Sequence, residues 1–239
     1  PRALWPDIGP PPGAPGSWEE LALDLAAGLE AHRLPPVIGI GHSFGGVTTL
    51  LAAARHRDLF RAVIVLDPTI LPLERMEAYG AAKAAGWTEG HPMAERARER
   101  RDRFLDHAEA FGYWREKRLF ADWPDEALQR YVEGMLAPVV GGGFMLRWSA
   151  AWEAYYYESF YSGTWSDLAH LEPSLPVLAI GGGTSDTFLP AARALFQQTV
   201  PQATLEVVPG LGHLFPQAAP APTTALVQGW LTRVLEGDQ

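Results

Sequence analysis

Residues 37–46 read Val-Ile-Gly-Ile-Gly-His-Ser-Phe-Gly-Gly, an apolar run that leads directly into a serine enclosed by glycines. Residues 37–40 have the length and composition of a short buried strand, and residues 47–54 start a helix of small side chains. Between them, residues 41–45 match the pattern G-x-S-x-G, in which the serine occupies a sharp turn from strand to helix. This stretch therefore predicts a serine hydroxyl that projects from the end of a strand.

The segments on either side continue the alternation of strand and helix. Further buried strands are predicted at residues 62–66, 177–180 and 204–208, with helices beginning after Ser17 and spanning about 191–198 and 223–235. We also expect residues 3–5 to end a strand. This alternation predicts an α/β fold, in which a mostly parallel sheet is flanked by helices on both faces.

The composition changes between residues 71 and 171, where charged helices and many aromatic side chains replace the strand signals. We interpret 71–171 as an inserted helical lid, and 1–70 with 172–239 as the core. Most of the aromatic side chains are expected to pack the lid helices together. Some should line a pocket over the serine, for which the candidates are Trp123, Trp148, Trp152 and Tyr156.

Charge and composition exclude several classes of function. The 19 Lys and Arg against 28 Asp and Glu give a net charge of −9, which disfavours nucleic-acid binding. The absence of cysteine removes thiolate nucleophiles and Cys-ligated metal sites. No apolar run is long enough to span a membrane, and no dinucleotide or phosphate-binding glycine motif occurs. We expect no metal or organic cofactor, and a cytoplasmic location; the oligomeric state stays open.

A serine hydroxyl is a weak nucleophile unless a base takes its proton. Of the seven histidines, His213 is favoured because it lies between the last predicted strand and the terminal helix, at the carboxyl edge of the sheet. A carboxylate should orient this imidazole. Asp67 and Asp186 each follow a predicted strand, and both remain candidates. The amide of Phe44, at the start of the helix after Ser43, is the expected donor to an oxyanion.

These motifs resemble the α/β-hydrolase fold superfamily. Residues 41–45 are similar to its nucleophile turn, Gly212-His213 to its histidine loop, and Trp5-Pro6-Asp7 to the residues after its fourth strand. Several lid motifs look like a capped subgroup that includes fungal acyl-CoA hydrolases and bacterial relatives. In that subgroup the acid follows strand six, which favours Asp67; the wider superfamily more often uses the position of Asp186.

The resemblance also implies strands that this sequence does not show. The superfamily places strands one to three before the segment that begins here, and the loop after strand three carries a second oxyanion donor. We therefore expect that about 50 further N-terminal residues belong to the natural protein.

The resemblance and the candidate residues imply a serine hydrolase that cleaves an ester or thioester of a small lipophilic acyl or aryl substrate through an acyl-serine. Serine at position 43 argues against the dehalogenase and epoxide hydrolase chemistry of relatives with a carboxylate nucleophile. Two alternatives stay open: a C–C bond hydrolase or perhydrolase that uses the same residues, and a hydrolase-like receptor that only binds its ligand.

Overall fold

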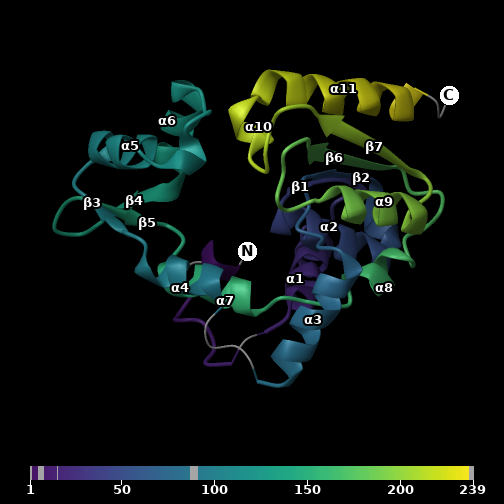
Figure 1. Ribbon diagram of the computed structural model, residues 1–239, viewed down its shortest axis with the longest axis horizontal. Helices are drawn as coiled ribbons and strands as arrows, with labels where there is room; N and C mark the ends of the chain where they lie inside the picture. Colours follow the sequence, from purple (N-terminus) through teal and green to yellow (C-terminus); the bar gives the residue numbers. More distant parts are fainter. Residues whose placement is uncertain (1, 5–7, 15, 87–90, 237–239) are drawn as a thin grey trace. The chain divides into compact units, whose positions relative to one another are not determined.

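The chain forms two compact units in the computed structural model, which describes residues 2–4, 8–14, 16–86 and 91–236 (Figure 1). The sheet unit consists of residues 17–86, 161–216 and 220–236, and the insertion unit of the described residues within 1–16, 87–160 and 217–219. Both units are made from separate stretches of the chain, so neither corresponds to one continuous segment.

The sheet unit contains four parallel strands in the order β1-β2-β6-β7. Their bounds are Val37–His42, Phe60–Leu66, Val177–Gly182 and Ala203–Val208. The register pairs His42 with Leu66, and Leu66 with Ile180. The carboxyl ends of these three strands therefore lie along one edge, which brings the loops that follow them together. The expected parallel α/β architecture is confirmed.

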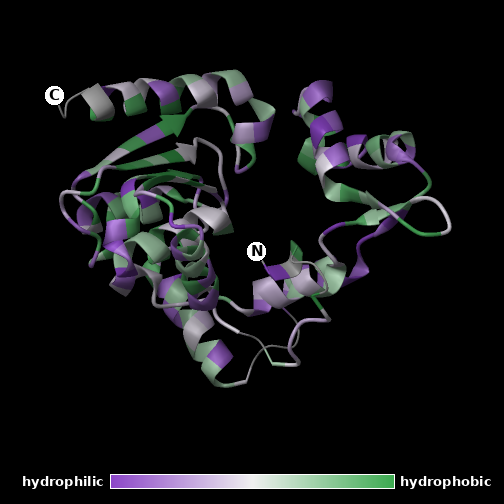
Figure 2. Ribbon diagram, turned by 180° about the vertical axis from the view of Figure 1, so that it is seen from behind, coloured by the Kyte–Doolittle hydropathy of each residue, from purple (hydrophilic) through white to green (hydrophobic). Residues whose placement is uncertain are grey.

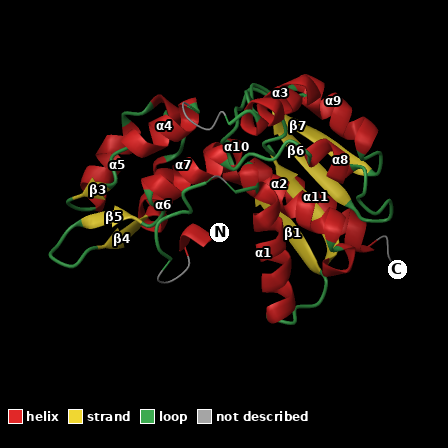
Figure 3. Ribbon diagram, turned by 90° about the horizontal axis from the view of Figure 1, so that it is seen from below, coloured by secondary structure: helices red, strands yellow, loops and turns green. Residues whose placement is uncertain are grey.

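Helices cover both faces of this sheet (Figures 1 and 3). Helix α11 (Pro220–Glu236) packs through Trp230 and its neighbours on the face that carries Ile64 and Ile180. Helix α2 (Phe44–Arg55) packs on the other face, where Gly46 lies against Val65. Hydrophilic and hydrophobic residues alternate along α11 in Figure 2, as expected for a helix with only one face on the sheet.

The remaining elements of the sheet unit surround this core. They are α1 (Trp18–Ala31), η2 (Arg57–Leu59), α3 (Leu73–Ala84), α8 (Thr164–Leu168) and α9 (Pro190–Thr199). Helix α1 begins after Ser17, as predicted, and the Ser17 hydroxyl caps it by accepting from the amide of Glu19. The short helix α10 (Phe215–Ala218) follows the loop that carries His213.

The insertion unit combines short helices with a small antiparallel sheet in the order β3-β5-β4. The strands are Arg103–Phe104, Phe144–Leu146 and Leu136–Pro138. The helices are α4 (Pro92–Glu99), α5 (His107–Arg115), η3 (Arg118–Phe120), α6 (Asp125–Met135) and α7 (Ala150–Glu158). Aromatic side chains fill much of its interior, as the composition predicts.

The insertion unit is shorter at both ends than the lid predicted at 71–171. Helices α3 and α8 belong to the sheet unit, where the Trp165 indole donates a hydrogen bond to the Leu71 carbonyl (3.0 Å). This contact joins the two ends of the predicted lid, and the local sequence around either residue does not predict it. The division into a core domain and a lid domain stays a prediction.

The N-terminal strand expected at residues 3–5 is wrong for Ala3 and Leu4, which lie in the 3-10 helix η1 (Arg2–Leu4). Among the described residues, no strand pairs with Ala3 or Leu4, and an extended segment without a partner is not stabilised. Trp5-Pro6-Asp7, which carry part of the family resemblance, lie outside the described residues. Within the described part of the chain, no helix has the length and apolarity needed to cross a membrane.

Candidate active site

Ser43 occupies the turn between β1 and α2 with φ 58° and ψ −128°. A positive φ is uncommon for a residue with a side chain and raises its energy, so the surroundings must hold it. Its amide donates to the Leu66 carbonyl (2.9 Å). A side chain at Gly41 would collide with the backbone of Gly45, so glycine is required there. The turn thus fixes the serine at the carboxyl edge of the sheet.

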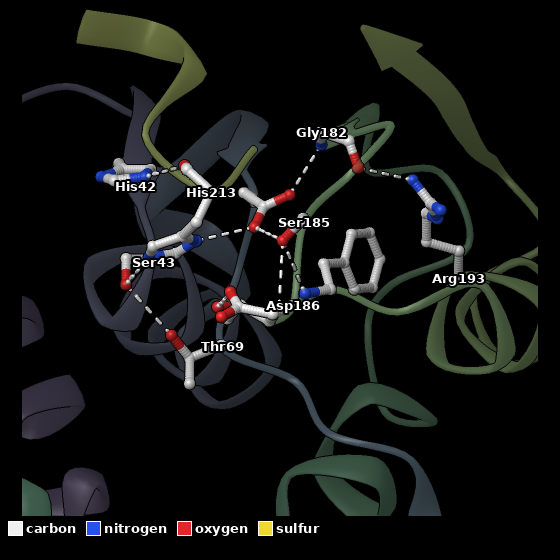
Figure 4. Close-up of polar contacts among 11 residues, drawn as sticks. His42, Ser43, Thr69, Gly182, Ser185, Asp186, Arg193 and His213 are labelled. Atoms are coloured by element: carbon white, nitrogen blue, oxygen red, sulfur yellow. Dashed lines mark hydrogen bonds and ion pairs between the residues drawn. The ribbon is translucent and has the colours of Figure 1, made fainter. Parts of the chain in front are cut away.

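His213 comes to Ser43 from the loop between β7 and α10 (Figure 4). Its Nε2 lies 2.9 Å from Ser43 Oγ, and 24% of its side chain is exposed. The loop is attached to the sheet unit by the amide of Thr184, which donates to the Leu211 carbonyl (2.9 Å). The predicted pair of hydroxyl and imidazole is therefore within hydrogen-bonding distance.

Asp67 completes this chain of contacts from the end of β2. Its carboxylate is fully buried, and Oδ2 lies 2.7 Å from His213 Nδ1. The amide of Gly182 donates to Oδ1 (2.7 Å), and the Ser185 hydroxyl donates to Oδ2 (2.5 Å). Because the buried carboxylate receives these hydrogen bonds, its burial is compensated.

The hydrogen-bond partners determine which imidazole nitrogen carries the proton. An ionised carboxylate only accepts, so His213 Nδ1 carries a hydrogen and donates it to Asp67. Nε2 is then the acceptor for the Ser43 hydroxyl. This is the arrangement in which an imidazole can take a proton from a serine that attacks a carbonyl.

The other candidate acid, Asp186, has an exposed side chain. The hydroxyl of Thr187 donates to it at 3.3 Å, and no hydrogen bond joins it to His213 within the described residues. Asp186 lies in the turn that follows β6, directly after Ser185. The structure therefore brings together Ser43, His213 and Asp67, without Asp186.

His42 is a further residue of the candidate site, and the sequence did not predict its contact with His213. Its Nε2 donates to the backbone carbonyl of His213 (3.0 Å), and the two imidazole rings lie 4.9 Å apart. Burial lowers the pKa of His42, so it is neutral at pH 7 and does not oppose a positive charge on His213. Its hydrogen bond goes to the backbone of His213 and holds the loop that carries the base.

We expect His42→Phe to lower kcat about 10-fold, because the carbonyl of His213 loses its donor and the base becomes less well positioned. His42→Gln should recover most of the loss, since its amide can still donate. Steady-state kinetics with thermal unfolding of both variants would check this. Equal kcat in His42→Phe and the parent chain would show that the bond is dispensable.

Phe44, the expected oxyanion donor, is the first residue of α2, and its ring packs edge-on against Trp18 (5.3 Å between centroids). The amides at the start of a helix point toward its N-terminal end, where negative charge is stabilised. Thr69 is a second residue that sequence interpretation missed: its Oγ1 lies 3.1 Å from Ser43 Oγ. Among the described residues, no group of three or more His, Cys, Asp or Glu could hold a metal ion.

The four predicted pocket residues lie in the insertion unit, in two separate aromatic clusters. Trp123 packs with Phe120 and Tyr131. Trp148 and Trp152 pack against Tyr156, and the Trp152 indole donates to the Gly9 carbonyl (2.9 Å). A hollow of about 370 Å³ in this unit is lined by other residues, including Arg98, Tyr155 and Glu158. A pocket role for the four residues stays a prediction.

Comparison with known proteins supports the architecture. The model of the alpha/beta hydrolase family matches residues 4–226. The 2-(acetamidomethylene)succinate hydrolase of Mesorhizobium japonicum is 27% identical over 215 residues, which are 89% of this chain and 70% of that protein. An sn-1-specific diacylglycerol lipase of Mus musculus is 27% identical over 211 residues, 86% of this chain and 62% of the lipase.

The crystal structure of an E-2-(acetamidomethylene)succinate hydrolase is similar over 92% of this chain and 75% of its own, with a TM-score of 0.70 and 23% identity. At this identity, the similarity concerns the fold. Since the family match spans the strand-turn-helix of Ser43 and the loop of His213, the chain belongs to the alpha/beta hydrolase family.

Proposed function

We propose that this chain is a serine hydrolase that cleaves an ester or thioester of a small lipophilic acyl or aryl substrate. The observation that carries this proposal is the continuous set of hydrogen bonds from Ser43 Oγ through His213 to the buried Asp67. A serine with an adjacent base and an orienting carboxylate is the arrangement that activates a hydroxyl for attack on a carbonyl.

In the first half of the reaction, Ser43 Oγ forms a bond to the carbonyl carbon of the substrate while its proton moves to His213 Nε2. The carbonyl oxygen becomes an oxyanion, which the Phe44 amide stabilises. When the tetrahedral intermediate collapses, the bond to the leaving alcohol or thiol breaks and that group takes the proton from His213. An acyl-serine remains, and Asp67 stays ionised throughout.

In the second half, water attacks the acyl-serine and gives its proton to His213. Collapse of this second intermediate breaks the bond between Ser43 Oγ and the acyl carbon, and His213 returns the proton to Oγ. The products are the carboxylic acid and the free serine. Asp67 stabilises the imidazolium in both halves because its carboxylate is 2.7 Å from Nδ1.

Two observations favour lipophilic esters. A relative from Mus musculus that is 27% identical is named as an sn-1-specific diacylglycerol lipase. The interior of the insertion unit is rich in buried aromatic side chains, which suit contact with acyl or aryl groups. Trp123, Trp148, Trp152 and Tyr156 are the residues that we propose for this contact.

The substrate class is tested by comparing kcat/KM for p-nitrophenyl esters of increasing acyl length, acyl-CoA thioesters and 1,3-diketones. We expect the esters or thioesters to be turned over at least 10-fold more efficiently than the diketones. A preference for diketones would instead indicate a C–C bond hydrolase on the same residues. Formation of peracid from hydrogen peroxide and a carboxylic acid would indicate a perhydrolase.

The receptor alternative is tested separately with a fluorophosphonate probe, which bonds covalently to an activated serine. We expect stoichiometric labelling that maps to Ser43. Failure of the parent chain to react, together with saturable binding of a lipophilic ligand, would contradict the enzyme proposal.

A further inference from the structure

Thr69 contacts the proposed nucleophile, although neither the motif nor the proposed triad includes it. It lies on the loop after β2, two residues beyond Asp67, and is half-buried. Its Oγ1 lies 3.1 Å from Ser43 Oγ, and its amide donates to the Ser43 carbonyl at 3.2 Å (Figure 4). Two contacts to one residue hold Thr69 beside the serine from both its backbone and its side chain.

The direction of the hydroxyl contact follows from counting hydrogens. Ser43 has one hydroxyl hydrogen, and the unprotonated Nε2 of His213 accepts it. The hydrogen between the two hydroxyl groups must therefore come from Thr69, which donates into a lone pair of Ser43 Oγ. Within the described residues, Ser43 Oγ is the only hydrogen-bond partner of Thr69 Oγ1 in the structure.

A donor at this oxygen affects the two halves of the reaction differently. When Ser43 attacks through its other lone pair, the donor draws electron density from the nucleophilic oxygen, so it gives attack little assistance. When the acyl-serine is hydrolysed, Oγ is the leaving group and gains negative charge before His213 returns its proton. A hydrogen bond to an atom that gains charge is stronger than one between neutral groups.

We propose that Thr69 is a further catalytic residue, whose hydroxyl stabilises Ser43 Oγ as it leaves the acyl carbon during deacylation. Thr69 keeps its own proton, and the proton that Oγ regains comes from His213. The backbone contact between Thr69 and Ser43 keeps the donor in place while the serine carries the acyl group. This inference rests on the proposed function, because it requires an acyl-serine.

The test separates acylation from deacylation in Thr69→Val, which removes the hydroxyl at nearly constant shape. Single-turnover release of p-nitrophenolate reports acylation, and decay of the acyl-enzyme by intact mass after quenching reports deacylation. We expect deacylation to slow roughly 10- to 100-fold, with acylation changed less than about 3-fold. Thr69→Ser should restore deacylation because it keeps the donor.

Thr187→Val is the matched control, since Thr187 is near the site but its hydroxyl bonds to Asp186 rather than to Ser43. Both rates should match those of the parent chain. If acylation and deacylation slowed equally in Thr69→Val, the role of Thr69 would be purely structural. If neither rate changed, Thr69 would have no role in the reaction. Either outcome overturns the proposal. Absence of any acyl-enzyme in the parent chain would instead overturn the proposed function, and the role of Thr69 with it.

Discussion

Replacement of Ser43 by alanine is expected to lower kcat by about 10⁶-fold, because the covalent route through an acyl-serine disappears. The hydroxyl is the atom that His213 Nε2 contacts at 2.9 Å, and no other side-chain oxygen of the described residues makes that contact. Reaction with the fluorophosphonate probe should be lost as well. Steady-state kinetics and intact mass after labelling would measure the two effects.

The loss in Ser43→Ala should not come from unfolding. Alanine meets the same positive φ as serine, and the amide that donates to Leu66 is unchanged, so the unfolding temperature should shift little. A second serine of the same network provides a matched control. Ser185 donates to Asp67 Oδ2 without contacting His213 by a hydrogen bond, so Ser185→Ala removes a similar hydroxyl that contacts the carboxylate and not the base.

We expect Ser185→Ala to lose about 10-fold in kcat, as one donor to a charged group is removed, and to keep its reaction with the probe. A Ser43→Ala protein that still reacts with the probe would show that another residue is the nucleophile. If Ser185→Ala instead abolished labelling, the roles assigned to the two serines would be wrong.

The sheet could be predicted well from sequence because its strands are short apolar runs, each bounded by turn residues. The strands predicted at residues 37–40 and 177–180 extend two residues further in the structure, to His42 and Gly182. These extra residues are not strongly apolar, but backbone pairing with the neighbouring strand continues through them. The ends of the insertion unit were less predictable because they depend on long-range contacts such as Trp165 with Leu71.

The site was predictable to the extent that local motifs and strand order determine it. Ser43 follows from the glycine spacing, and His213 from its place after the last strand. The acid could not be chosen from these signals, because Asp67 and Asp186 both follow strands that end at the same edge. Burial and the donors from Gly182 and Ser185 distinguish them, and both are properties of the folded chain.

The contacts of His42 and Thr69 could not be predicted from the sequence either, because they too are properties of the folded chain. His42 bonds to a residue 171 positions away, and Thr69 to one 26 positions away. Neither residue type signals such a contact by itself. A pattern that spans strand, turn and loop therefore predicts the nucleophile and the base more readily than the groups that contact them.

Replacement of Asp67 by asparagine is expected to lower kcat by roughly 10⁴-fold. The amide of asparagine has nearly the shape of the carboxylate, but its nitrogen donates and its oxygen carries no full charge. Where the amide nitrogen faces Nδ1, the imidazole adopts the other tautomer, and Nε2 then bears a hydrogen and cannot accept from Ser43. An imidazolium formed during attack also loses its neighbouring negative charge.

Asparagine is suited to this test because it tolerates the left-handed backbone of Asp67, whose φ is 44°. The variant should therefore remain folded, which thermal unfolding would verify. Asp186→Asn is the matched control: its side chain is exposed and bonds only to Thr187 among described residues, so kcat should stay within about 2-fold of the parent.

The comparison decides between the two carboxylates because the same chemical change is made in a buried and an exposed position. A large loss in Asp186→Asn with little change in Asp67→Asn would mean that the loop after β6 rearranges to place Asp186 against His213 during turnover. Small and equal losses would mean that His213 acts without a carboxylate. A loss of kcat confined to Asp67→Asn would show that the buried carboxylate at the end of β2 orients the base.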